Sequence, residues 1–158
     1  MSKQVGSKYE ATKHLDTAAV AKLIREDIAT EQKAGALKGF KCSVRTRRFA
    51  GGSAIDVEIT AVPAGVELIQ REYVVSALAR RARPGSYQDV PRHSATVETA
   101  LEKLRQFVAA YNFDGSDAMT DYFHVRYYSH VSVSSALQEP AYDAVLASIK
   151  PEDVERYC

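Results

Sequence analysis

Three arginines stand close together in the first third of the chain, immediately before a pair of glycines. They are Arg45, Arg47 and Arg48, followed by Gly51 and Gly52. Guanidinium groups bind carboxylates and phosphates through paired N–H donors, and the amides of a glycine turn can point outward at an anion. The pattern predicts an anion or phosphate site. A simpler interpretation is a solvated strand face on which Asp56 and Glu58 neutralise the arginines.

Nucleophilic catalysis is the second chemistry to consider. The chain has four histidines, His14, His93, His124 and His130, and a nucleophilic site would need Cys or Ser beside one of them. Cys42 falls at an inward position of a predicted strand, where cysteine usually packs as a small hydrophobic residue. We therefore expect no catalytic residues and predict that the protein is not an enzyme.

An acidic turn is the third candidate. Asp114, Asp117 and Asp121 have oxygen ligands at intervals that resemble a loop for a hard cation. The complete calcium-loop pattern, with its closing bidentate Glu, is missing. Turn and capping roles explain these residues better, and we expect neither a metal nor another cofactor.

A β-hairpin from Phe40 to Val62 must position the arginines. Apolar or small residues occupy every second place from Phe40 to Thr46, and the alternation resumes from Ile55 to Ala61. The glycines between the two runs accept positive φ, which favours a tight turn. The three arginines should therefore lie near the end of a hairpin with one apolar face.

Helices are predicted on both sides of this hairpin. Helical spacing of apolar residues indicates a helix capped by Asp16 or Thr17, one beginning at Val66, and one capped by Ser94. Alternation then predicts a third strand from Tyr122 to Val133, with His124, Arg126, Tyr128 and His130 on one side. A helix from Tyr142 to Ile149 follows. The expected fold is α+β, with helices on one face of an antiparallel sheet of about three strands, in the order α-β-β-α-α-β-α.

Composition limits the function classes. The 158 residues suit a single domain, and 21 Lys and Arg against 20 Asp and Glu exclude a strong global field for nucleic acid. Cys42 and Cys158 form no metal-binding spacing, which fits a reducing cytoplasm. Neither a membrane span of about 18 apolar residues nor a signal peptide is expected, so we predict a cytoplasmic protein without a membrane partner.

Three stretches resemble a family found in mobile elements, the large polyvalent protein-associated domain of type twenty-nine. They are YEATKHLDTAAVAKLIR at 9–25, FKCSVRTRRFAGGSAIDVEIT at 40–60 and AAYNFDGSDAMTDYFHVRYYSHVSV at 109–133. The resemblance covers a family-like core at 9–133 within a single domain, 1–158, and leaves 134–158 as a C-terminal addition. It implies a phage or plasmid protein without established catalytic residues, some members of the group acting in counter-defence.

Two functions follow as expectations. The first is a small non-enzymatic binding protein that inhibits a host defence protein or complex, of the anti-CRISPR or anti-restriction type. The second is a nucleic-acid-binding module for single strands or duplex, formed if the third strand pairs with the hairpin and joins its cations to aromatic rings. The candidate binding residues are Arg45, Arg47, Arg48, Arg126, Tyr128 and His130. The target and the oligomeric state do not follow from the sequence.

Overall fold

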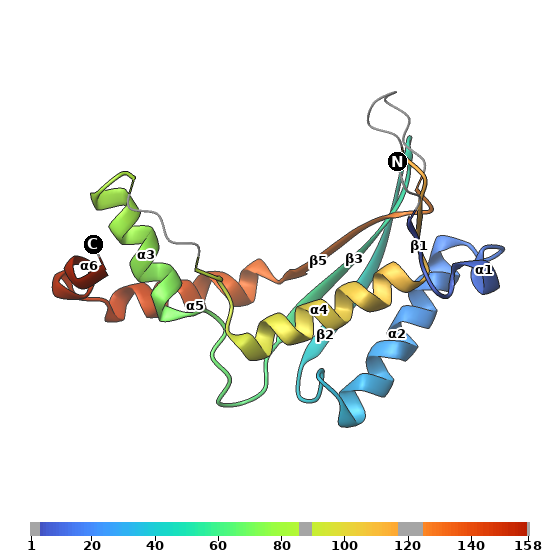
Figure 1. The fold of residues 1–158 in the computed structure, drawn as a ribbon. Coiled ribbons are helices and arrows are strands. Elements are labelled where there is room, and N and C mark those ends of the chain that lie inside the picture. The colour runs from blue at the N-terminus through green and yellow to red at the C-terminus, as the bar shows by residue number, and fades with distance from the viewer. Residues whose placement is uncertain (1–3, 86–89, 117–124, 158) are drawn as a thin grey trace.

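A computed structural model describes residues 4–85, 90–116 and 125–157, and a long hairpin dominates it (Figure 1). Strand β2 (Lys41–Phe49) pairs antiparallel with strand β3 (Gly52–Ala61). Gly52, with φ of +146°, begins β3 at the turn, in a conformation that residues with a side chain rarely adopt. The predicted hairpin is confirmed.

Strand β5 (Tyr128–Val133) completes a three-stranded sheet in the order β2-β3-β5. β5 runs parallel to β3, so the sheet is mixed, and the expectation of a wholly antiparallel sheet is wrong. Parallel neighbours need a crossover connection, and the long helical segment between β3 and β5 supplies it. β5 also begins later than the predicted Tyr122. Residues 122–124 lie outside the described part of the chain.

Two helices cover one face of the sheet. Helix α2 (Thr17–Ala34) begins after Asp16, whose side chain accepts from the N–H of Ala19, and helix α4 (Ala95–Ala110) begins after Ser94, which caps Val97 in the same way. Both caps were predicted. The apolar stripes of the two helices pack against Val57 and Ile59 of β3, and all of these residues belong to one continuous core.

Short N-terminal elements that the alternation did not predict tie the chain start to α4. Strand β1 (Gln4–Val5) pairs antiparallel with strand β4 (Phe113–Asp114), and helix α1 (Tyr9–Thr12) follows it. Gly6 allows this approach, because a Cβ there would lie 2.2 Å from the carbonyl oxygen of Ala109. Residues 4–12 therefore belong to the folded structure.

The remaining helices gather at the far end of the molecule from the hairpin turn (Figure 1). Helix α3 (Arg71–Ala82) starts five residues after the predicted Val66, because residues 68–70 pair with 92–94 instead: Gln70 N–H donates to Arg92 O and Ser94 N–H to Leu68 O. Helix α5 (Ser135–Ser148) begins earlier than expected and contains Pro140. Helix α6 (Pro151–Tyr157) ends the described chain.

The α+β class is confirmed, although β1, α1, β4 and α6 extend the predicted order of elements. Within the described residues, no helix combines the length and apolar character needed to cross a membrane.

Candidate binding face of the sheet

The side of the sheet opposite α2 and α4 carries the candidate residues, and we call it the open face. Strand register places its side chains in three rows across β2, β3 and β5. The rows are Ser43–Glu58–Ser132, Arg45–Asp56–His130 and Arg47–Ala54–Tyr128. Residues of the first two rows, together with Thr46 and Arg47, line a hollow of about 510 Å³. The pairing of the third strand with the hairpin, on which the predicted surface depended, is confirmed.

Arg47 and Asp56 form a two-pronged ion pair on the open face. Arg47 Nε donates to Asp56 Oδ2 at 2.5 Å, and Nη2 donates to Oδ1 at 3.2 Å. The hydrogen bonds from Arg47 hold the pKa of Asp56 below its ordinary value, with His130 adding a smaller effect of the same sign. One of the predicted cations is therefore neutralised by a neighbouring acid, as the simpler interpretation proposed.

Arg45 keeps its charge exposed on the same face. It stands opposite Asp56 in the register but forms no ion pair with any residue that the structure describes, since Asp56 is held by Arg47. Glu58 lies in the adjacent row. The open face is thus a mosaic of both signs rather than a basic patch.

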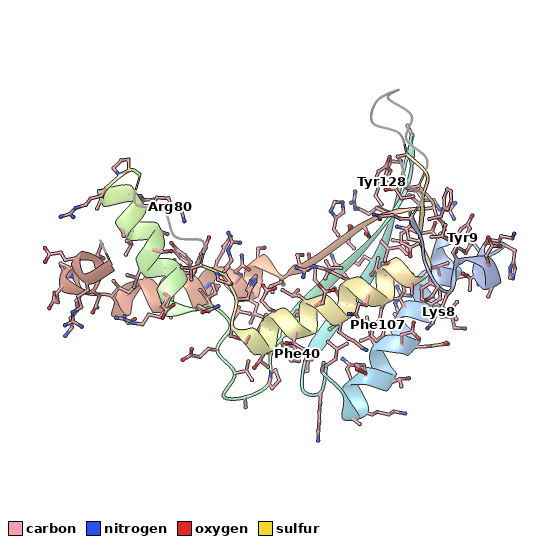
Figure 2. The ribbon with its side chains drawn as sticks, in the orientation of Figure 1. Lys8, Tyr9, Phe40, Arg80, Phe107 and Tyr128 are labelled. Carbon is pink, nitrogen blue, oxygen red and sulfur yellow. The ribbon has the colours of Figure 1, made fainter. Side chains whose placement is uncertain are left out.

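Two aromatic rings border the turn end of the open face. Phe49 is 44% exposed and Tyr128 38% exposed, and their ring centroids lie 5.9 Å apart. Figure 2 shows Tyr128 near the hairpin turn. The hollow beside them, about 380 Å³, is lined also by Gly51, Ala54 and His130. Sequence reasoning missed Phe49, although extending the odd-numbered alternation of β2 by one step would have found it.

Arg48 does not belong to the open face. Its partner in the register is Ser53, whose hydroxyl lies 2.7 Å from that of Thr17 at the start of α2. Arg48 therefore points to the opposite side of the hairpin, and the predicted cluster of three arginines is wrong because successive strand residues alternate between faces.

Arg126 is also placed elsewhere. It precedes β5, and its guanidinium donates to the main-chain oxygens of Thr12, Leu15 and Tyr111, with Nη1–Tyr111 O at 2.8 Å and Nη2–Leu15 O at 3.2 Å. The same group lies 5.4 Å from the ring centroid of Tyr9. The expectation that Arg126 shares a face with Arg45 is wrong: it holds α1 to the end of α4.

Cys42 does not lie beside His130, as a nucleophilic pair would require. Cys42 stands in register with Ile59 on the core side, whereas His130 lies on the open face. Burial raises the pKa of the Cys42 thiol to about 11, which disfavours the nucleophilic thiolate at neutral pH. His93 is held between Glu98 and Gln138, with Nε2–Oε1 of Gln138 at 2.8 Å. His124 lies outside the described residues.

The acidic turn is described only at Asp114. Its carboxylate accepts from the N–H of Ser116 at 2.9 Å, and these hydrogen bonds lower the pKa of Asp114. This is the turn role that the sequence favoured. Asp117 and Asp121 lie outside the described residues. Among the residues described, no three His, Cys, Asp or Glu side chains converge as metal ligands would.

The open face can therefore offer guanidinium groups, carboxylates, an imidazole and two aromatic rings to a flat partner. Comparisons with known proteins add no relative: no protein-family model, no curated protein and no solved structure matches this chain.

Proposed function

We propose that this protein is a small non-enzymatic binding protein, and that it binds a protein partner through the open face. The observation that carries the proposal is the pair of exposed rings, Phe49 and Tyr128, next to Arg45 and the Arg47–Asp56 pair. Aromatic residues and arginine are enriched at protein interfaces, and most of the binding energy comes from a few of them.

The mixed charge of the open face supports a protein partner over nucleic acid. Asp56 and Glu58 stand in the middle strand, where a phosphate backbone would meet them. A protein partner can instead place its own charges against both signs, which favours one orientation of binding.

The biological setting of the proposal comes from the sequence resemblance. We propose that the partner is a host defence protein or complex, and that the protein acts in the cytoplasm on behalf of a phage or plasmid. Inhibition by contact needs no catalytic group, only a surface that occupies a site on its target.

Affinity capture tests the proposal. The tagged full-length chain is incubated with host lysate, with and without nuclease, beside two variants. The first variant is Arg45→Ala with Tyr128→Ala, which alters the open face; the second is Arg48→Ala, which alters the other side of the hairpin. We expect one stoichiometric partner that survives nuclease, is lost with the first variant and is kept with the second.

Equal recovery of the partner by both variants would contradict the assignment of the open face. The proposed function itself would be contradicted by two results together: no protein partner is recovered, and a defence complex assayed directly with the protein is not inhibited.

A second candidate is binding of single-stranded nucleic acid, favoured by the rings of Phe49 and Tyr128 beside Arg45. Bases stack on exposed rings while cations hold the phosphates. If this function is correct, the affinity of the protein for a labelled single strand should fall as the salt concentration rises. The affinity should be lower still for Tyr128→Ala. Affinity that does not change with salt would count against it.

A further inference from the structure

The two edges of the three-stranded sheet differ in how their main-chain groups are used. On the β2 edge, side chains of α2 occupy outward carbonyl groups: Arg25 Nη2 donates to Val44 O at 2.7 Å, and Gln32 Nε2 donates to Phe40 O at 2.9 Å. Occupied carbonyls reduce the ability of an edge to pair with another strand.

The β5 edge has no such protection from described residues. Ser134 N–H donates to Ile59 O at 2.9 Å, which fixes the phase of the parallel ladder, so the even-numbered residues of β5 bond to β3. The N–H and C=O groups of Ser129, Val131 and Val133 then point away from the sheet. Across the described ranges, no side chain or main-chain group bonds to them.

A groove runs along this unprotected edge. It consists of two adjoining hollows, about 540 and 330 Å³, which share Arg105 and Val131 in their linings. The first hollow is bounded by Val5 of β1, Val108 of α4 and Phe113 of β4. Val5 is 52% exposed, so its apolar side chain is accessible to a molecule lying in the first hollow.

Charged side chains of both signs line the two hollows: Arg92 and Arg105 against Glu98 and Asp114. Arg105 Nη1 lies 3.5 Å from Glu102 Oε2 and 4.0 Å from Glu98 Oε2. An occupant therefore needs no particular charge. It needs donors and acceptors repeated at every second residue, to match the outward groups of β5, and apolar side chains that face Val5, Val108 and Phe113.

We infer that the outer edge of β5 binds an extended peptide segment of the protein partner, which adds a fourth strand to the sheet. The added strand would lie beside Tyr128 and His130, so its outer side chains would continue the open face without a gap. The inference rests on the proposed function in that the partner is a protein, and it names the chemistry of the partner: an extended segment in which every second side chain is apolar.

One substitution and its control isolate the edge. Ser129→Pro removes an outward N–H without removing a bond of the β3–β5 ladder, and Ser129→Ala loses the same hydroxyl but keeps the N–H. The probe is a phage-displayed library of random peptides, selected on the wild-type full-length chain. Affinity of the selected peptides is then measured by fluorescence anisotropy.

We expect selected peptides to alternate apolar and polar residues and to bind wild type and Ser129→Ala equally. Binding to Ser129→Pro should be weaker by roughly tenfold or more, since an edge hydrogen bond is lost and the ring clashes with the added strand. Equal binding to all three proteins, or a selection that yields no peptide, overturns the inference.

Amide exchange provides a test that needs no variant. The amides of Ser129, Val131 and Val133 should exchange rapidly in the free protein and slowly with a selected peptide bound, whereas those of His130 and Ser132 should be slow in both. Slow exchange of the odd-numbered amides in the free protein would show an edge already covered. If that protection grew with protein concentration, the occupant would be a second copy, and the inference would also fail.

The same variants separate this inference from the proposed function. Capture of a host partner that is lost with Arg45→Ala/Tyr128→Ala but kept with Ser129→Pro supports the open face and rejects the edge. The reverse result supports the edge and rejects the open face as the contact.

Discussion

At the scale of single residues, the arginines singled out by their type serve different purposes. Arg45 projects from the open face, Arg47 is held by Asp56, and Arg126 is used to fasten the chain to itself. Their positions in the alternating pattern are similar. What distinguishes them is whether oxygen atoms from distant parts of the chain surround the guanidinium.

Arg126 should therefore contribute to stability rather than to binding. Arg126→Ala removes donors to the carbonyls of Thr12, Leu15 and Tyr111, and leaves these acceptors unsatisfied where the site is partly buried. We expect the free energy of unfolding to fall by about 2–3 kcal/mol, measured with chemical denaturant. Arg45→Ala is the matched control and should unfold almost as wild type does. Equal loss in both variants would contradict the structural role of Arg126.

Cys42 should behave as a packed thiol. Because burial raises its pKa to about 11, the thiolate is scarce at pH 8, and native Cys42 should react with a thiol reagent far more slowly than unfolded Cys42 does. The measurement uses Cys158→Ser, which leaves Cys42 as the only thiol of the sequence. Rapid reaction of the native protein would contradict the packing of Cys42 on the core side.

At the scale of elements, the hairpin has two faces. Alternation in the sequence predicted its core face, whereas the ion pairs on its outer face depend on the register between β2 and β3. Arg47 contacts Asp56 because the two-residue turn aligns β2 and β3 so that these side chains are diagonal neighbours. A shift of one residue would move Asp56 to the core side.

The Arg47–Asp56 ion pair contributes to the stability of the hairpin in a way that depends on acid pH. The pKa of Asp56 is lowered by folding, so its contribution is complete above the ordinary value of 3.8 and is lost as pH falls through the lowered pKa. The difference in melting temperature between wild type and Arg47→Gln should thus be present at pH 7 and shrink as the pH falls below 3.8. Arg48→Gln is the control. A difference that stayed constant down to pH 2 would contradict this account.

At the scale of the whole molecule, helix α5 contributes little to the buried core, although its neighbour α3 buries Val74, Val75, Ser76 and Ala79. Helices α2 and α4 bury four and five residues against the sheet, whereas α5 contains no fully buried residue. α5 and α6 lie beside α3 (Figure 1). An ion pair at 2.8 Å also joins Arg71 of α3 to Asp153 of α6.

Local stability should follow this distribution. Because α5 has no fully buried residue whereas α4 has five, the amides of α5 and of α6 after it should open and exchange well before those of α4. Native-state hydrogen exchange checks this, with α4 as the internal reference. Exchange of α5 as slow as that of α4 would show that the C-terminal helices unfold only with the core.

Short-range patterns in the sequence determined the hairpin, the caps at Asp16 and Ser94, and the apolar stripes of α2 and α4, because period-2 and period-3.6 spacing and capping act within a few residues. Long-range contacts decided the rest. The parallel placement of β5, the β1–β4 pair, the late start of α3 and the fate of Arg126 each depend on main-chain groups brought together from separate parts of the chain. Hydrogen bonds between such groups depend on the packed core that brings the segments together. The spacing of residues within one short segment therefore cannot predict these bonds.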